Sequence, residues 1–144
     1  MPVFIDTNIL VYADDESFPV KQKISAGLIA ETYREGTGVI SSQVMQEYYN
    51  VAILKLKLAP PFAAERLRFF SKFQVVSATP QLVLSAALLH QRLSVSFWDA
   101  MILQAAIISG CNALYSEDLN QGEIVAGVKI INPFAKPRGA AVTR

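Results

Sequence analysis

The chain has 144 residues, a formal net charge of +1 and a hydrophobic content of 52%. This length and apolar content favour one globular domain with a sizeable core, and they argue against a disordered chain. The near-neutral charge neither indicates nor excludes nucleic-acid binding, because a local basic patch can bind phosphates in a protein of ordinary charge.

The first half of the chain predicts two strands, each followed by a helix. Residues 3–5 are apolar and read as a short buried strand. Residues 16–36 carry apolar side chains at helical spacing, and Gly36 is a plausible stop. A second strand is expected at 38–41, and a helix at 41–57, which begins with serines suited to capping.

The second half continues the alternation of helices and strands. Prolines near the start of two of the expected helices stand where a first helical turn tolerates them. The expected helices cover residues 60–73, 79–93 and 96–110, the expected strands cover 73–78, 112–116 and 128–132, and residues 135–144 are expected to form a short, frayed tail.

This alternation favours an α/β fold with a mostly parallel sheet of about five strands and helices on both faces. Ligands of such sheets usually bind beyond the carboxyl ends of the strands. Asp6, Ser41 and Ser116 all stand at such ends. The carboxyl edge of the sheet is therefore the expected place for a functional site.

Four acids are candidates for that site, and each also has a structural interpretation. Asp6 either caps the next element or holds a cation, because a carboxylate at the end of a buried strand must be solvated, paired or coordinated. Glu47 falls within the apolar stripe of its helix, where an ordinary glutamate would face solvent. Asp99 has capping-box spacing from Ser96, and Asp118 suits a turn.

The four acids together suggest a metal site. Two like charges about 4 Å apart repel by roughly 4 kcal/mol at an effective dielectric constant of 20. Such a group therefore needs either protonation or a divalent cation. Because the chain has one histidine and no thiol cluster, the ligands would all be oxygen atoms, which suits Mg²⁺ or Mn²⁺ rather than zinc. Phosphoryl transfer and phosphodiester hydrolysis are the chemistry expected of such a cleft.

The motifs resemble those of the PIN-domain family, and more narrowly those of the VapC-type toxins of bacterial toxin–antitoxin pairs. The resemblance extends from Val3 to about Phe134, and its order and spacing are more specific than any single motif. The matching residues are Asp6-Thr7-Asn8, Ser41-Ser42-x-x-x-x-Glu47, Ser96-Phe97-Trp98-Asp99-Ala100 and Tyr115-Ser116-Glu117-Asp118.

The resemblance implies a three-layer αβα sandwich, with a nuclease domain over residues 1–134. It implies a Mg²⁺-dependent ribonuclease, with Mn²⁺ as a possible substitute, that leaves a 3′ hydroxyl and a 5′ phosphate. It also implies an antitoxin protein as partner, RNA as substrate, and a homodimer. The residues it assigns are Asp6, Glu47, Asp99 and Asp118 as catalytic acids and metal ligands, Asn8 and Ser116 as supporting polar groups, and Thr7 as part of the local turn.

Two other functions remain open from the sequence. An aspartyl-nucleophile phosphatase would also place an aspartate after the first strand, but it would normally have a second acid where Asn8 stands. The other alternative is a PIN-like module that has the nuclease fold but binds RNA or a protein partner without catalysing a reaction. The lone histidine, His90, follows two leucines late in a helix and is a poor candidate for metal-free acid–base catalysis.

The remaining observations concern location and charge. The single cysteine, Cys111, excludes an intramolecular disulfide and, with no recognisable secretory signal, predicts a cytoplasmic protein. The apolar run at 100–110 is too short to cross a bilayer, so no membrane association is expected. Scattered basic residues between Lys55 and Lys72 suit a solvated face, although a few could flank the cleft and hold RNA.

Overall fold

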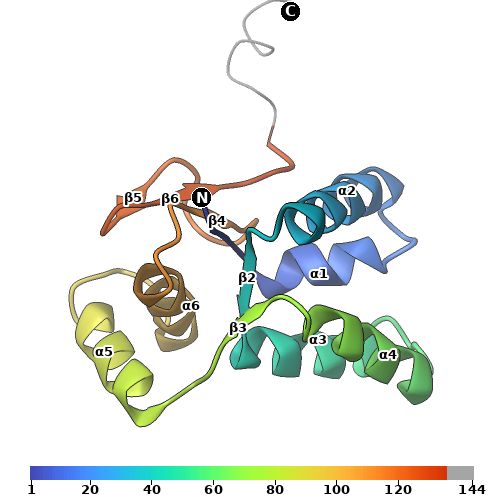
Figure 1. The fold of residues 1–144 in the computed structure, drawn as a ribbon, viewed down its shortest axis with the longest axis horizontal. Coiled ribbons are helices and arrows are strands. Elements are labelled where there is room, and N and C mark those ends of the chain that lie inside the picture. Colours follow the sequence, from blue (N-terminus) through green and yellow to red (C-terminus); the bar gives the residue numbers. More distant parts are fainter. Residues whose placement is uncertain (136–144) are drawn as a thin grey trace, which may run out of the picture.

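One sheet organises the computed structural model, which describes residues 1–135 (Figure 1). In this part of the chain its strands are β1 (Val3–Ile5), β2 (Gly38–Ser41), β3 (Gln74–Val76), β4 (Ala113–Tyr115), β5 (Ile124–Val125) and β6 (Val128–Ile131). The strand order is β3-β2-β1-β4-β6-β5, and only the β5–β6 pair is antiparallel. The predicted α/β fold with a mostly parallel sheet is confirmed.

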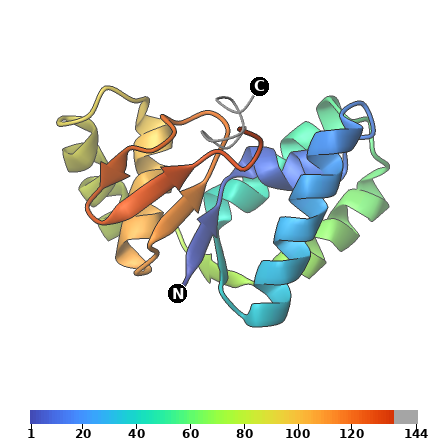
Figure 2. The same ribbon diagram turned by 90° about the horizontal axis from the view of Figure 1, so that it is seen from above.

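Helices cover the sheet in pairs. They are α1 (Thr7–Ala13), α2 (Pro19–Glu35), α3 (Ser42–Leu54), α4 (Pro60–Phe70), α5 (Pro80–His90) and α6 (Phe97–Ile108). In Figure 1, α2 lies on the upper side of the molecule and α3 to α6 lie on the lower side, while α1 packs against both α2 and α3. Seen from above, α5 and α6 form a pair at the left and the first four helices gather at the right (Figure 2).

Local chemistry defines the helix ends. Pro19, Pro60 and Pro80 occupy the first helical positions, where the missing N–H is not needed. The side chains of Ser41, Thr79 and Ser96 accept hydrogen bonds from the first turns of α3, α5 and α6, respectively. The predicted stop of α2 at Gly36 is confirmed, because this residue adopts the left-handed conformation with φ of 70°.

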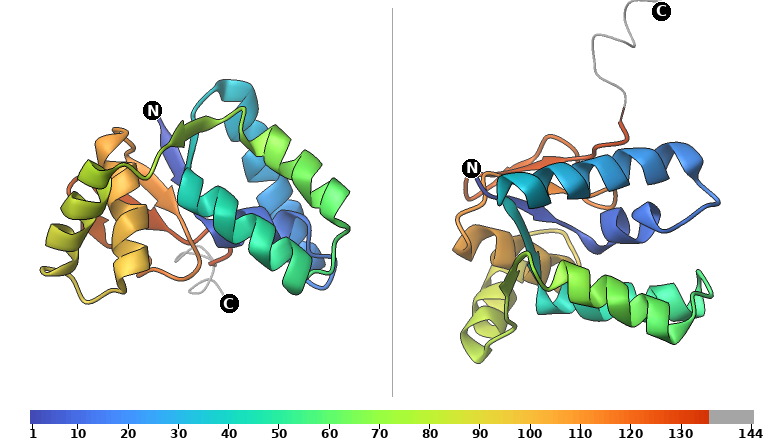
Figure 3. Two further views of the ribbon diagram at one scale, coloured as in Figure 1. Left: turned by 90° about the horizontal axis from the view of Figure 1, so that it is seen from below. Right: turned by 45° about the vertical axis from the view of Figure 1, so that its right-hand side comes forward.

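The register of β1 and β4 brings the carboxyl ends of these two strands side by side. Ile5 of β1 is paired with Tyr115 of β4, so the next residues, Asp6 and Ser116, emerge side by side at the carboxyl edge of the sheet. β2, the other neighbour of β1, ends at Ser41, which begins α3. From below, α1 and α3 are seen to run close together from this edge (Figure 3).

The core lies between the sheet and the helices and includes fully buried side chains from the central strands, such as Phe4, Ile40 and Leu114. α6 is almost entirely buried from Ala100 to Ala106, which explains why its sequence is apolar on nearly every face. In a helix that is buried on nearly every side, charged side chains are accommodated only near the ends, where they can reach solvent. Asp99, in the first turn, is its one acid.

Two elements were missed by the sequence prediction. α1 has seven residues, of which Thr7, Ile9 and Val11 are β-branched, so neither its length nor its composition indicates a helix. β5 has two residues and reaches β6 through a turn in which Ala126 and Gly127 have positive φ angles. The sheet therefore has six strands in the described part rather than about five.

Two further expectations concern the ends of the chain and the membrane. Residues 136–144, most of the expected tail, lie outside the described residues, and the boundary at residue 134 stays a prediction. Over residues 1–135, no helix is both long enough and apolar enough to span a bilayer.

Candidate active site

Asp6 is the buried acid at the end of β1. Its carboxylate is 6% exposed, and both oxygens are engaged: Oδ1 accepts the Thr7 N–H at 2.7 Å and Oδ2 accepts the Ser116 hydroxyl at 2.7 Å. The pKa of Asp6 is raised to about 6, mainly by burial and further by the nearby charges of Asp118 and Glu47, against the lowering effect of the two hydrogen bonds. Asp6 thus caps α1, as one of its two interpretations predicted.

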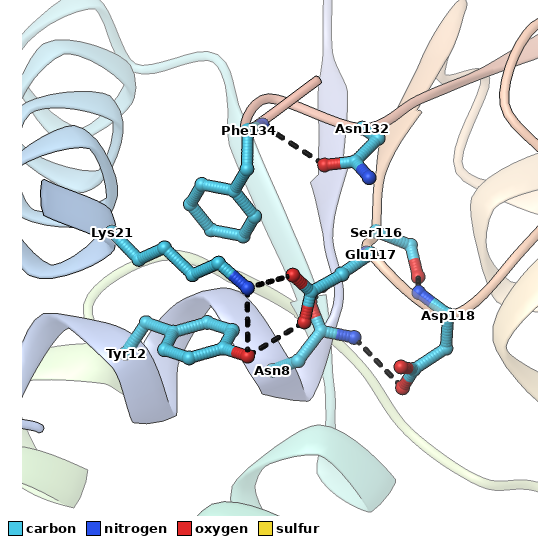
Figure 4. Close-up of polar contacts among 8 residues, drawn as sticks. All are labelled: Asn8, Tyr12, Lys21, Ser116, Glu117, Asp118, Asn132 and Phe134. Carbon is cyan, nitrogen blue, oxygen red and sulfur yellow. Dashed lines mark hydrogen bonds and ion pairs between the residues drawn. The ribbon is translucent and has the colours of Figure 1, made fainter. Parts of the chain in front are cut away.

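Asp118 reaches the same edge from the loop after β4. Its carboxylate Oδ2 accepts a hydrogen bond from Asn8 Nδ2 at 3.0 Å, and its backbone N–H donates to Ser116 Oγ at 3.2 Å (Figure 4). The Ser116 hydroxyl therefore accepts from the Asp118 backbone and donates to Asp6. Asn8 and Ser116, predicted as supporting residues, lie between the two acids.

Glu47 points from α3 toward α1. Its Oε1 accepts the hydroxyl proton of Thr7 at 2.6 Å, and its Oε2 accepts from Gln43 Nε2 at 3.2 Å. The prediction that Glu47 turns inward from its helix is confirmed. Thr7 does more than serve the local turn, because its backbone holds Asp6 while its side chain holds Glu47.

Asp99 completes the group from the first turn of α6. Its backbone N–H donates to Ser96 Oγ at 3.1 Å, so the predicted capping role of Ser96 is confirmed. Burial raises the pKa of Asp99, the hydrogen bond of Ser96 lowers it, and the charges of Asp118 and Glu47 raise it again. The charges of Asp118 and Glu47 therefore raise the pKa of both Asp6 and Asp99, so the four carboxylates interact electrostatically as one group.

This group lacks a basic counterpart among residues 1–135. The ion pairs found there are Lys21–Glu117, Arg66–Asp14 and Arg68–Glu65, and none includes any of the four acids. Instead, neutral donors hold Asp6, Glu47 and Asp118. Burying a charged carboxylate without a cation costs free energy. The pKa of Asp6 is raised for this reason, because burial favours the neutral form.

The donor set fits a hard divalent cation by its chemistry, because every candidate ligand is an oxygen. Its present spacing is wider than a closed metal site. Over the described range, no group of three or more histidine, cysteine, aspartate or glutamate side chains is arranged tightly enough to enclose an ion. The acids would have to approach one another to enclose an ion, and the assigned metal and catalytic roles stay predictions.

A groove runs beside Glu47 and Asp118, two of the four acids. A cavity of about 460 Å³ is lined by Thr7, Asn8, Glu47 and Asp118, and it adjoins a second cavity of about 490 Å³ near the start of α2. Lys55 lines both cavities. Lys55 offers a positive charge to an anionic ligand in this groove.

Sequence reasoning missed several polar residues around the acids. Gln43 stands one helical turn before Glu47, a spacing that could have indicated the contact. Tyr12 and Lys21 both contact Glu117, the neighbour of Asp118, although they lie more than ninety residues away in the sequence. Such a contact leaves no local sequence signal.

Comparisons with known proteins identify a family and a shared fold. The model of the family described as "PIN domain" matches residues 3–126. A comparison with curated protein sequences gives no match.

Three solved structures share the fold. The toxin VapC20 of Mycobacterium tuberculosis, described as cleaving the sarcin–ricin loop, is 19% identical with a TM-score of 0.65, covering 81% of this chain and 89% of that one. A toxin–antitoxin complex from Klebsiella pneumoniae is 20% identical, with a TM-score of 0.64 and coverages of 93% and 98%. VapBC2 of Rickettsia felis, bound to a promoter DNA fragment, is 22% identical, with a TM-score of 0.58 and coverages of 82% and 89%.

Proposed function

Because this chain belongs to the PIN domain family, we propose that it is a metal-dependent endoribonuclease and the toxin of a type II toxin–antitoxin pair. The observation that carries the proposal is the convergence of Asp6, Glu47, Asp99 and Asp118 at one sheet edge without a basic partner in the described residues. The similar solved structures are described as toxins or toxin–antitoxin complexes, which supports the same assignment.

The proposed cofactor is Mg²⁺, with Mn²⁺ as a substitute, because the available donors are carboxylate, amide and hydroxyl oxygens. When bound, such an ion would lower the pKa of a coordinated water and stabilise charge on a scissile phosphate. Asp6, Glu47, Asp99 and Asp118 would hold it.

The surrounding polar residues would orient these acids. Ser116 and the Thr7 backbone fix both oxygens of Asp6, so that this carboxylate keeps one orientation. The Thr7 hydroxyl fixes Glu47, and Asn8 fixes Asp118. An aspartyl-nucleophile mechanism is disfavoured, because such an enzyme would normally have a second acid where Asn8 stands.

We also propose an antitoxin protein and a second copy of the chain as partners, in the cytoplasm. The named complexes of similar fold support an antitoxin. Val83, Leu84 and Leu88 on α5 are 40%, 66% and 63% exposed, an apolar surface that supports association with another chain.

The test is RNA 5′-end mapping after brief induction of the wild type, of Asp99→Asn and of Glu31→Gln in a bacterial host. Glu31 is an exposed acid on α2 and provides a matched change of acid to amide away from the site. Discrete new 5′ ends are expected with the wild type and with Glu31→Gln, but not with Asp99→Asn. Purified protein should cleave the identified RNA in Mg²⁺ and not in EDTA.

Two results would contradict the proposal. Cleavage that persists in EDTA would exclude a metal-dependent nuclease. RNA that binds tightly to the purified protein in Mg²⁺ without any cleavage, at the same affinity in EDTA, would indicate the binding module that the sequence left open.

A further inference from the structure

A second polar cluster lies beside the acids and is not used by the proposed chemistry. Lys21 of α2 forms an ion pair with Glu117, the residue that precedes Asp118. Tyr12 of α1 donates its hydroxyl proton to the other oxygen of Glu117 at 2.6 Å and lies 3.3 Å from Lys21 Nζ. Figure 4 shows these three side chains meeting next to Asn8 and Asp118.

Aromatic rings surround the ammonium group of Lys21. Its Nζ lies 4.8 Å from the ring centroid of Tyr12, 5.4 Å from that of Phe134 and 5.7 Å from that of Phe18. Tyr12 packs edge-on against both phenylalanines. Lys21 is therefore held by side chains from α1, from the segment before α2 and from the segment after β6, and it has little freedom to move away from Glu117.

The loop held by Lys21 is the one that carries Asp118. The Glu117 backbone N–H donates to Asn8 Oδ1 at 3.2 Å, while Asn8 Nδ2 donates to Asp118 Oδ2 at 3.0 Å. One amide side chain thus contacts the backbone of Glu117 and the carboxylate of Asp118. Any movement of Glu117 changes the position of Asn8 and, through it, the orientation of Asp118.

Charge gives the contact a second consequence. Glu117 lines the groove together with Glu47 and Asp118, so without a partner it would add a further negative charge beside the acids. Lys21 compensates this charge and turns the carboxylate of Glu117 toward α2.

We propose that Lys21 is a positioning residue of the acid cluster, which acts through Glu117 to fix the Glu117–Asp118 segment and, through Asn8, the orientation of Asp118. This inference rests on the proposed function, because it assumes that the acids bind a divalent cation. It adds two residues, Lys21 and Glu117, whose effect on the site is indirect.

The first test needs no activity. In metal-free protein, Lys21→Met should increase the hydrogen-exchange rate of the Glu117 and Asp118 amides by about tenfold, since both amides belong to the loosened loop and would separate from their acceptors, Asn8 Oδ1 and Ser116 Oγ. The Ser116 amide donates to Ile131 O within the sheet and should exchange at the wild-type rate, as an internal control. Lys21→Arg keeps the positive charge and should restore part of the protection.

The second test is calorimetric titration with Mg²⁺. Lys21→Met should weaken binding by about tenfold, the size of effect seen for residues that orient metal ligands. Glu117→Gln keeps the aromatic packing of Lys21 while removing the ion pair, and should also weaken binding. Arg68→Met breaks an exposed ion pair on α4 and should bind as the wild type does.

The outcomes separate this inference from the proposed function. If the wild type cleaves RNA while Lys21→Met and Glu117→Gln keep wild-type amide exchange and Mg²⁺ affinity, the positioning role is wrong and the nuclease stands. If both variants lose protection and affinity but the wild type cleaves no RNA, the positioning role stands and the ribonuclease is wrong. A wild type that binds no Mg²⁺ overturns both.

Discussion

Asp6 and Ser116 are joined by a 2.7 Å hydrogen bond between side chains that are 110 residues apart in the sequence. The contact arises from the register of β1 and β4, which ends both strands at the same level. Ser116 is fully buried, so no water replaces it as a donor to Asp6.

Ser116→Ala should therefore impair the site more than the fold. Removing the hydroxyl leaves Asp6 Oδ2 without its close donor and the Asp118 N–H without its acceptor, which should lower Mg²⁺ affinity and RNA cleavage by about 10- to 100-fold. Calorimetry and cleavage rates measure the two effects. Ser109→Ala removes a hydroxyl that bonds the end of α6, and it should leave both at wild-type values. Equal behaviour of the two variants would refute the role of Ser116.

The stability of the metal-free protein should fall as the pH rises from about 4 to above 6. The pKa of Asp6 is raised from 3.8 to about 6 by burial, so the folded state binds more protons than the unfolded state between these values. At 1.36 kcal/mol per unit, the shift corresponds to about 3 kcal/mol of stability that is present below pH 4 and lost above pH 6.

Urea unfolding in EDTA at pH 4, 5, 6 and 7 measures this loss. Asp6→Asn removes the titrating group and should flatten much of the pH dependence, while Asp99, with a raised pKa, leaves a residual slope of the same sign and Glu117, with a lowered pKa, one of the opposite sign. Added Mg²⁺ should restore stability above pH 6, because a cation favours the charged carboxylate. A wild type and an Asp6→Asn variant with the same slope would contradict the prediction.

Gly38 should tolerate no side chain. A Cβ at this position would lie 2.5 Å from the ring of Phe73, so Gly38→Ala must displace a well-packed aromatic residue at the start of β2. Overpacking of this kind costs roughly 1–3 kcal/mol. Gly27→Ala is the matched control: it lies within α2 with open space around it and should stabilise the protein by roughly 0.4–1 kcal/mol. Chemical denaturation compares the two.

The sequence sufficed for the elements whose signals are local. The starts of α5 and α6 follow from the N-caps Thr79 and Ser96, and the C-terminal end of α2 follows from Gly36. Capping is readable from the sequence because it depends on residues within one helical turn. The inward direction of Glu47 followed from helical periodicity alone. These inferences needed no knowledge of tertiary structure.

The arrangement of the site could not be obtained in the same way. Whether Asp6 serves as a cap or as a ligand depends on Ser116 and Asp118, which the sheet register brings beside it. The pairing of Lys21 with Glu117 depends on how α2 lies against the loop after β4. The sequence singles out four acids by their positions, but only the fold shows that neutral donors lie between them.

Thr7 is the residue whose role changed most between sequence and structure, and it offers a direct test of the site. Its hydroxyl donates to Glu47 Oε1 at 2.6 Å, whereas its backbone N–H donates to Asp6. Thr7→Val removes the first hydrogen bond and keeps the second, with little change in side-chain shape. We expect cleavage to fall by about tenfold with only a small change in melting temperature, because Glu47 loses a donor at the site and the helix cap remains.

The control for this change is Thr32→Val. Thr32 donates its hydroxyl proton to the Leu28 carbonyl within α2, so its loss should leave cleavage at the wild-type rate. Thr7→Ser keeps the hydroxyl and should recover most of the activity lost in Thr7→Val. If Thr7→Val cleaves RNA as fast as the wild type, Glu47 needs no positioning from α1. If Thr7→Ser is as slow as Thr7→Val, packing of the Thr7 methyl group, rather than its hydrogen bond, supports the site.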